Sequence, residues 1–180
     1  MNSMNNDLNG WLVINKDLGM TSRQVVNIIK KTLNVKKIGH AGTLDPLATG
    51  VLALAIGKAT KTVKYIMDGI KKYSFTIKWG ISTDTQDAEG KITSKSNKKP
   101  DEIKLKAILK NIVGEINQIP PKFSAIKVNG KRAYNLARNG KKFILKSRKV
   151  FLKKIEVVEK NVKKIPCTSF EIECGKGFYV

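Results

Sequence analysis

Residues 39–50 of this chain read GHAGTLDPLATG and decide how its first part folds. The stretch contains a carboxylate, the single histidine of the chain and three glycines. It lies between Ile38 and an apolar run over 51–56 that predicts a buried strand. Glycine permits unusual backbone geometry, and Pro46 biases the residue before it towards an extended conformation. We therefore expect Asp45 to be held at a defined angle beside a surface that admits a ligand, although a structural Asp-Pro turn is the alternative.

The composition favours a folded domain with a polyanionic partner. The chain has 180 residues, 41% of them apolar, and a formal charge of +21. A chain of this length can bury one core, and such a positive excess most simply indicates nucleic acid. No run of 18 apolar residues predicts a membrane span, and residues 1–9 read as a disordered tail without an export signal. Cys167 and Cys174 are expected on opposite faces of one strand and not as a metal pair, which fits a reducing cytoplasm.

The hydrophobic pattern interleaves strands and helices without a repeating βαβ unit. Thr21 and Gln24 fit a capping box that starts a helix reaching to about residue 34. Further helices are expected over 60–69, from 101 onwards with Ile103 and Ile112 on its apolar face, and over 132–138. Strands are expected over 10–15, 51–56, 73–79, 91–94, 123–128, 150–158 and 168–174, with a loop over 82–90 and an Asn129-Gly130 turn. This pattern predicts an α+β fold with a large mixed or antiparallel sheet.

The stretch 39–50 resembles the signature G-H-x-G-x-L-D-P-x-A-x-G of the TruB family of tRNA pseudouridine synthases, and each fixed position is met. Further segments fit the family in the same order. They are residues 71–73, 83–90, 120–130, 132–140 and 174–180. The resemblance runs from Gly10 to the last residue. It implies the pseudouridine synthase fold as one catalytic domain over 10–180, with an RNA-gripping insertion at about 120–148 and no C-terminal PUA-like domain within these residues.

The resemblance implies a reaction as well as a fold. A uridine in the T-arm of tRNA, position 55, would be flipped out of its stack and its base rejoined to the ribose through C5. Asp45 matches the catalytic aspartate, which can serve as nucleophile or as base. The family uses no metal and no cofactor for this chemistry.

The substrate-binding residues implied by the resemblance also have ordinary structural interpretations. His40 matches a residue near the flipped nucleotide, and a loop histidine is its alternative. Tyr73 matches the tyrosine that stacks on the target base, although its alternation with Phe75 and Ile77 equally predicts a core aromatic. The remaining candidates for this site are Lys72, Gly42, Thr43 and Leu44.

The segment that matches the RNA-gripping insertion carries the candidate RNA-binding residues. They are Lys122, Lys127, Lys131, Arg132, Tyr134 and Arg138. Basic side chains on a hairpin and a short helix suit contacts with phosphates, and a solvated basic surface is the alternative. Thr83, Asp84, Thr85 and Asp87 are expected to bond to one another in a structural loop.

The sequence stops at Val180, inside the last motif. In the family an arginine that pairs with the catalytic aspartate follows at once, so we expect this chain to be a truncated product or fragment. The first hypothesis is a cytoplasmic, monomeric tRNA isomerase without an obligate protein partner. The second is a non-catalytic tRNA-binding or tRNA-folding module, and the third is a guide-RNA-dependent relative that acts on ribosomal RNA with partner proteins. The compact insertion favours the first over the third.

Overall fold

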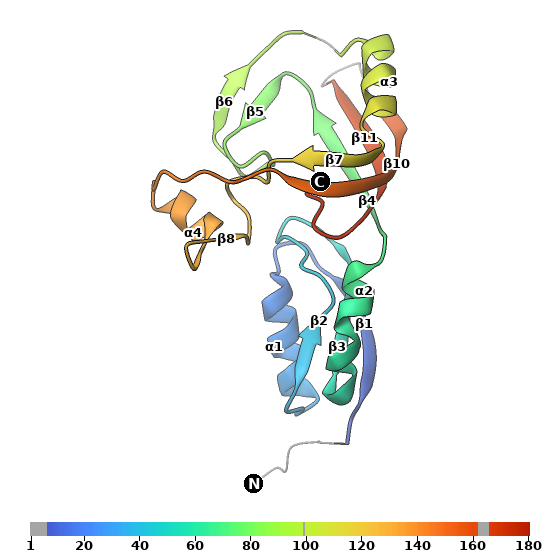
Figure 1. The fold of residues 1–180 in the computed structure, drawn as a ribbon, viewed down its shortest axis with the longest axis vertical. Helices are drawn as coiled ribbons and strands as arrows, with labels where there is room; N and C mark the ends of the chain where they lie inside the picture. Colours follow the sequence, from blue (N-terminus) through green and yellow to red (C-terminus); the bar gives the residue numbers. More distant parts are fainter. Residues whose placement is uncertain (1–6, 99, 162–165) are drawn as a thin grey trace. The chain divides into compact units, whose positions relative to one another are not determined.

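The computed structural model describes residues 7–98, 100–161 and 166–180 and divides the chain into two compact units, Met1–Gly69 and Ile70–Val180. Each unit is built on its own antiparallel sheet (Figure 1). The α+β class predicted from the sequence is confirmed. No helix in the described part of the chain has the length and apolar character to cross a membrane.

The first unit contains a three-stranded sheet in the order β1-β3-β2. Strand β1 covers Gly10–Lys16, β2 covers Ile38–His40, and β3 covers Gly50–Ile56. Helix α1 covers Ser22–Thr32 and begins with the predicted capping box, in which the Gln24 amide donates to Thr21 Oγ1 at 3.1 Å. Two predicted strands and the first helix are therefore confirmed.

One face of this sheet packs against α1. Val25 of the helix is buried against Leu52 and Leu54 of β3, the latter with no exposed surface. Around them lie the partly buried side chains of Leu12, Ile14, Met20, Val26, Ile29, Ile38 and Leu44. Because strand residues alternate between faces, Leu12 and Ile14 of β1 reach the same core.

The predicted helix over 60–69 needs correction at its start. The chain first forms a 3-10 helix, η1, over Gly57–Thr62 and then α2 over Val63–Asp68. The Thr60 and Thr62 hydroxyls donate to carbonyls three residues earlier, which suits the tighter 3-10 turn. The apolar side chain of Ile66 remains 48% exposed.

The second unit contains a four-stranded antiparallel sheet in the order β4-β11-β10-β7. Strand β4 covers Lys71–Lys78, β7 covers Gly114–Gln118, β10 covers Arg148–Asn161, and β11 covers Cys167–Cys174. Three of these strands were predicted. Strand β7 was missed because it lies at the edge of the sheet and carries one apolar side chain, Ile116.

The core of this unit forms where the two central strands meet. Leu152, Ile172 and Cys174 are buried there, and Tyr73 and Phe75 of β4 pack against them. The Phe75 and Phe170 rings stack with centroids 5.3 Å apart. The face of β4 that was predicted to be apolar therefore packs on this core.

The loop prediction over 82–90 is correct for its second part. Strands β5 (Ile81–Thr83) and β6 (Ile92–Lys95) form a hairpin, so the loop starts later than expected. Its side chains bond to the loop itself, as predicted. Thr83 Oγ1 donates to the Asp87 carbonyl at 2.8 Å, and Asp84 Oδ1 accepts the Lys91 amide at 2.8 Å.

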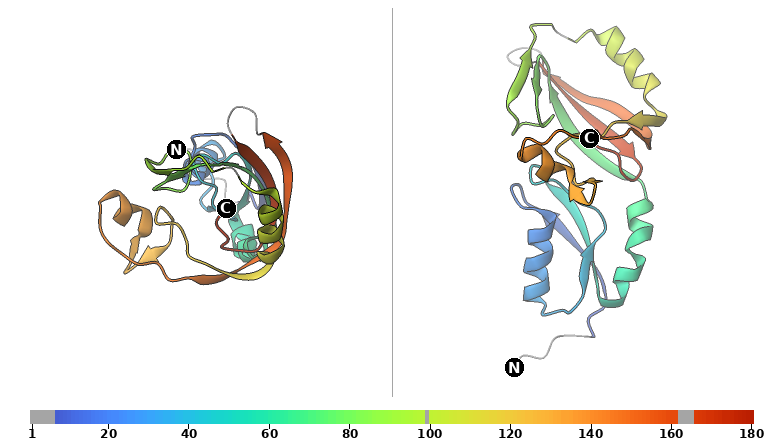
Figure 2. Two further views of the ribbon diagram at one scale, coloured as in Figure 1. Left: turned by 90° about the horizontal axis from the view of Figure 1, so that it is seen from above. Right: turned by 60° about the vertical axis from the view of Figure 1, so that its left-hand side comes forward.

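The expected strand over 123–128 is wrong except for its last two residues. Strands β8 (Lys127–Val128) and β9 (Lys131–Arg132) pair around the predicted Asn129-Gly130 turn, in which both residues have positive φ. Helix α4 (Ala133–Arg138) follows. The Ser124 and Ile126 carbonyls accept the amides that begin α4, so they do not pair with a strand. The hairpin and α4 extend away from the four-stranded sheet (Figure 2).

Helix α3 covers Glu102–Asn111 and starts, as predicted, at Asp101, whose carboxylate accepts the Ile103 and Lys104 amides. Its expected apolar face is not buried. Ile103 is 82% exposed, and it is Ile112, just after the helix, that reaches the core.

Candidate active site

The loop that carries Asp45 continues from the sheet of the first unit. The Ala41 amide donates to the Ala53 carbonyl at 2.9 Å and extends the pairing of β2 with β3. His40 Nδ1 lies 2.6 Å from the Gly42 carbonyl oxygen. A carbonyl can only accept, so this ring nitrogen carries the proton. Gly42 has a φ of +140°, and a Cβ atom added there would meet no other atom within 4 Å, so conformation and not crowding favours glycine.

Asp45 begins a tight turn at the surface. The Ala48 amide donates to the Asp45 carbonyl at 3.0 Å, and the Asp45 and Thr43 side chains are exposed. A carboxylate in this place is accessible to a large substrate. The sequence predicts that Asp45 is held at a defined angle, and this depends on what fixes Leu44 and Pro46 on its two sides.

Ser22 fixes the residue before Asp45. Its Oγ donates to the Leu44 carbonyl at 3.0 Å and accepts the Leu44 amide at 2.9 Å. Ser22 is 2% exposed, and the Leu44 side chain packs on the core formed by Val25, Leu52 and Leu54. Leu44 is therefore held through both its backbone groups and its side chain.

Lys16 and Gly19 fix the residue after Asp45. Lys16 has no exposed surface, and its Nζ donates to the Met20 carbonyl at 2.7 Å, to the Asp17 carbonyl at 2.9 Å and, at 3.5 Å, to the Pro46 carbonyl. The Gly19 amide donates to the same Pro46 carbonyl at 2.8 Å. Sequence reasoning missed Lys16 and Ser22. The signal was available for Lys16, because alternation along β1 places it on the face of Leu12 and Ile14.

Tyr73 and Lys72 belong to the second unit, on β4. The Tyr73 side chain is half-buried against the core of that unit. Lys72 Nζ lies 2.7 Å from Glu171 Oε2 on β11. This hydrogen bond and the neighbouring negative charge raise the pKa of Lys72, and the same bond lowers the pKa of Glu171. An RNA phosphate would have to compete with Glu171 for Lys72.

Five of the six predicted RNA-binding residues lie on the β8–β9 hairpin and α4, and the sixth, Lys122, lies in the loop before β8. Lys122, Lys127 and Lys131 are exposed. The Arg132 guanidinium donates to the Ala125 carbonyl, and the Arg138 guanidinium lies 5.8 Å from the centre of the Tyr134 ring. Residues 120–148 contain nine Lys and Arg and no Asp or Glu. This segment therefore presents positive charge without an internal counter-charge.

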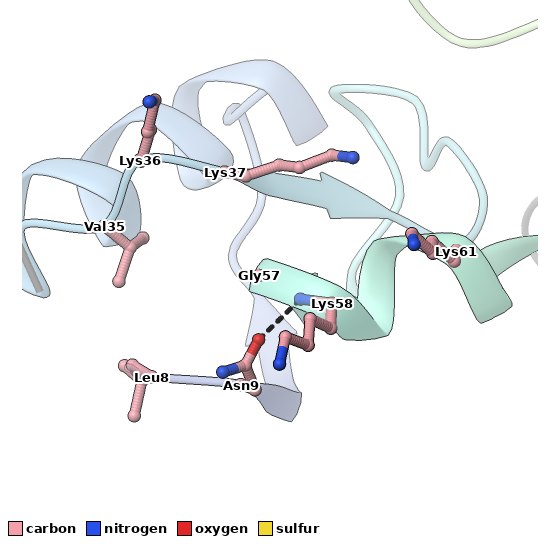
Figure 3. Close-up of a pocket in the computed structure, with 8 residues that line it drawn as sticks. All are labelled: Leu8, Asn9, Val35, Lys36, Lys37, Gly57, Lys58 and Lys61. Atoms are coloured by element: carbon pink, nitrogen blue, oxygen red, sulfur yellow. Dashed lines mark hydrogen bonds between the residues drawn. The ribbon is translucent and has the colours of Figure 1, made fainter. Parts of the chain in front are cut away.

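A second basic feature of the first unit was not predicted. A pocket of about 240 Å³ is lined by Lys36, Lys37, Lys58 and Lys61 together with Leu8, Asn9, Val35 and Gly57 (Figure 3). It lies beside the start of β2 and the end of β3, at the opposite end of these strands from the aspartate loop. Asn9 Oδ1 accepts the Lys58 amide at 2.6 Å and closes one side. Over the described ranges, no three His, Cys, Asp or Glu side chains converge as metal ligands would.

Solved structures share this arrangement of elements. The chain aligns over 93% of its length with a chain in the crystal structure of a Cbf5-Nop10-Gar1 complex, at 30% identity and a TM-score of 0.64, and covers 40% of that chain. It aligns similarly with a chain of an H/ACA RNP bound to a substrate RNA containing 2′-deoxyuridine, at 28% identity and a TM-score of 0.60, covering 38% of that chain. The fold is thus one found in an RNP that binds a substrate RNA.

The family is shown by the sequence. Residues 30–180 match the model of the TruB family pseudouridylate synthase (N terminal domain), and the chain belongs to this family. It is 48% identical over 176 residues to the tRNA pseudouridine synthase B of Bradyrhizobium diazoefficiens and 49% identical over 173 residues to that of a Caulobacter species, strain K31. These alignments cover 97% and 96% of this chain but 50% and 55% of the two relatives. The chain spans about half the length of the curated relatives it matches.

Proposed function

We propose that this chain supplies the catalytic aspartate of an enzyme that converts a T-arm uridine of tRNA, position 55, into pseudouridine. The observation that carries the proposal is Asp45, exposed in a loop whose preceding and following residues are both anchored to buried side chains. Relatives named tRNA pseudouridine synthase B, at 48% and 49% identity, support tRNA as the substrate. The chain matched in the Cbf5-Nop10-Gar1 complex is less similar, at 30% identity.

The reaction is an isomerisation in which one glycosidic bond replaces another. The bond between ribose C1′ and uracil N1 breaks, the base turns, and a bond between C1′ and C5 forms. The proton on C5 leaves and N1 gains one, so no oxidant or reductant is required. The Asp45 carboxylate can attack a carbon or remove a proton, and a fixed position favours either role.

RNA binding is assigned to a different set of residues. Lys122, Lys127, Lys131 and Arg138 would neutralise phosphates of the stem-loop, and Tyr134 would pack against its backbone or a base. In the same proposal Tyr73 stacks on the flipped uracil and His40 stays close to it. The flip costs a few kcal/mol, which these contacts must offset.

Tritium release from a T-arm stem-loop labelled at uracil C5 tests the proposal. The chain is used in excess over RNA and compared with its Asp45→Asn variant, which preserves the shape of the side chain without a carboxylate. Release that depends on Asp45 is expected. No release from the parent chain, with RNA still bound in a gel shift, would contradict catalysis by this polypeptide.

The second candidate is a tRNA-binding or tRNA-folding module without catalysis. Segment 120–148, which contains no Asp or Glu, favours this candidate. Its basic side chains could bind tRNA without any residue of the aspartate loop, which lies at 39–50. Such a module would accelerate tRNA folding equally well with Asp45→Asn. A folding assay with both proteins therefore separates the two candidates.

A further inference from the structure

We propose that Ser22 and Lys16 are positioning residues for Asp45, because they fix the backbone on the two sides of the carboxylate. The inference rests on the proposed function and names the residues that make its aspartate effective. We call Lys16, Gly19 and Ser22 the aspartate cradle. None of the three touches the reacting atoms in this proposal.

Ser22 is suited to this role by its geometry. A single buried hydroxyl serves as donor to the Leu44 carbonyl and as acceptor for the Leu44 amide, at 3.0 and 2.9 Å. Because the hydroxyl acts both as donor and as acceptor, the two hydrogen bonds together fix the orientation of the Leu44 backbone. A methyl group at this place would leave two backbone groups unsatisfied.

Lys16 and Gly19 complete the cradle on the other side. Two donors converge on the Pro46 carbonyl, the Gly19 amide at 2.8 Å and Lys16 Nζ at 3.5 Å. The shorter bonds of Lys16 to the Asp17 and Met20 carbonyls fix the backbone of residues 16–20, which includes Gly19. Asp45 thus lies between two anchored residues. A shift of about 1 Å in a reacting group can reduce a rate by ~100-fold, so this anchoring matters for chemistry.

The competing interpretation is that Ser22 merely stabilises α1. It is the first residue of that helix, directly after the N-cap Thr21. Thr21→Ala provides the matched control. It removes the capping box with Gln24 from the same helix end, and none of the hydrogen bonds described for Leu44 and Pro46 involves Thr21.

The test measures the single-turnover rate constant and the dissociation constant with the C5-tritiated stem-loop, each corrected for the folded fraction by circular dichroism. We expect Ser22→Ala to reduce the rate constant by about 10- to 100-fold with unchanged RNA affinity. Thr21→Ala should keep the parental rate constant. Ser22→Cys, with a weakly hydrogen-bonding thiol of similar length, should fall between them. If Ser22→Ala does not fold, Ser22→Cys takes its place, and a smaller reduction in the rate constant is then expected.

Hydrogen exchange of a peptide covering residues 41–50 gives a readout that is independent of activity. Exchange should be faster in Ser22→Ala and unchanged in Thr21→Ala. Equal effects of the two substitutions on rate and exchange would overturn the positioning role, as would a loss of RNA affinity with an unchanged rate constant. If the parent chain releases no tritium, the proposed function fails, and the exchange comparison still decides whether the cradle holds the loop.

Discussion

Replacing Lys16 with methionine tests how a fully buried ammonium contributes to the first unit. The side chain has no exposed surface, and its Nζ donates at 2.7 and 2.9 Å to the Met20 and Asp17 carbonyls. Methionine has a similar length and no donor. The Pro46 carbonyl would keep the Gly19 amide at 2.8 Å, so the main loss falls on two acceptors.

Two opposing terms decide the size of the effect. Each acceptor left unsatisfied costs about 1–3 kcal/mol. Against this, burying the ammonium in the parent chain carries a desolvation penalty that methionine removes, and its apolar atoms gain about 1 kcal/mol. Because three carbonyls already solvate the ammonium, we expect the hydrogen bonds to dominate. The net loss in the free energy of unfolding should be about 2–3 kcal/mol.

The assay must report on the first unit alone. Trp11 lies on β1, and Trp79, the second tryptophan of the chain, follows β4 in the other unit. In a Trp79→Phe background, fluorescence during urea unfolding follows Trp11. The expected loss lowers the midpoint by about 1–3 M urea at an m-value of about 1–2 kcal/mol/M.

An exposed lysine provides the control for this measurement. Lys36→Met should change the free energy of unfolding by less than about 0.5 kcal/mol. If Lys16→Met were as stable as the parent chain or more so, desolvation would outweigh the three hydrogen bonds, and the ammonium would not be what holds the cradle in shape.

Three further experiments probe the two units. Gly57→Ala should lower the free energy of unfolding in urea by about 2–3 kcal/mol, because φ is +58° and the new Cβ would lie 2.7 Å from a backbone carbonyl oxygen. Gly140→Ala is the control, since φ is +64° but the space is open, and it should cost about 1 kcal/mol in its own unit. Equal costs would show that the close contact at Gly57 adds nothing. Leu54→Ala should cost about 2–5 kcal/mol in the same assay, since the side chain has no exposed surface, and a cost below about 1 kcal/mol would contradict the described core. Iodoacetamide should alkylate Cys167 well before Cys174 by mass spectrometry, because Cys174 is 1% exposed and burial raises the pKa of its thiol, whereas equal rates would refute this packing.

Local signals predicted the elements that local chemistry determines. The capping box at Thr21, the helix start at residue 101 and the Asn129-Gly130 turn are each completed within a few residues, and each is present. Strand β7 and the extent of η1 depend on partners elsewhere. An edge strand with a single apolar residue gives little periodic signal, so its pairing with β10 could not be read from its own composition.

The aspartate loop shows the same limit at the site. Its glycines predicted an unusual backbone, and Gly42 and Gly50 have positive φ. Asp45 lies between them and is exposed. They did not predict the hydrogen bonds that select one conformation, since Ser22 lies 22 residues before Leu44 and Lys16 lies 30 residues before Pro46. The residue types within 39–50 do not indicate which distant side chains donate hydrogen bonds to this loop.

The division of the chain into two units separates chemistry from binding in the proposed enzyme. The bonds by which the aspartate cradle holds Leu44 and Pro46 come from residues 16–22, within the first unit. The acid-free segment 120–148 belongs to the second unit and contributes none of them. A change in the cradle should therefore act on the rate constant and a change in the basic segment on salt-dependent affinity, whereas Tyr73, in the second unit but assigned to the reacting base, is the position at which both quantities should change together.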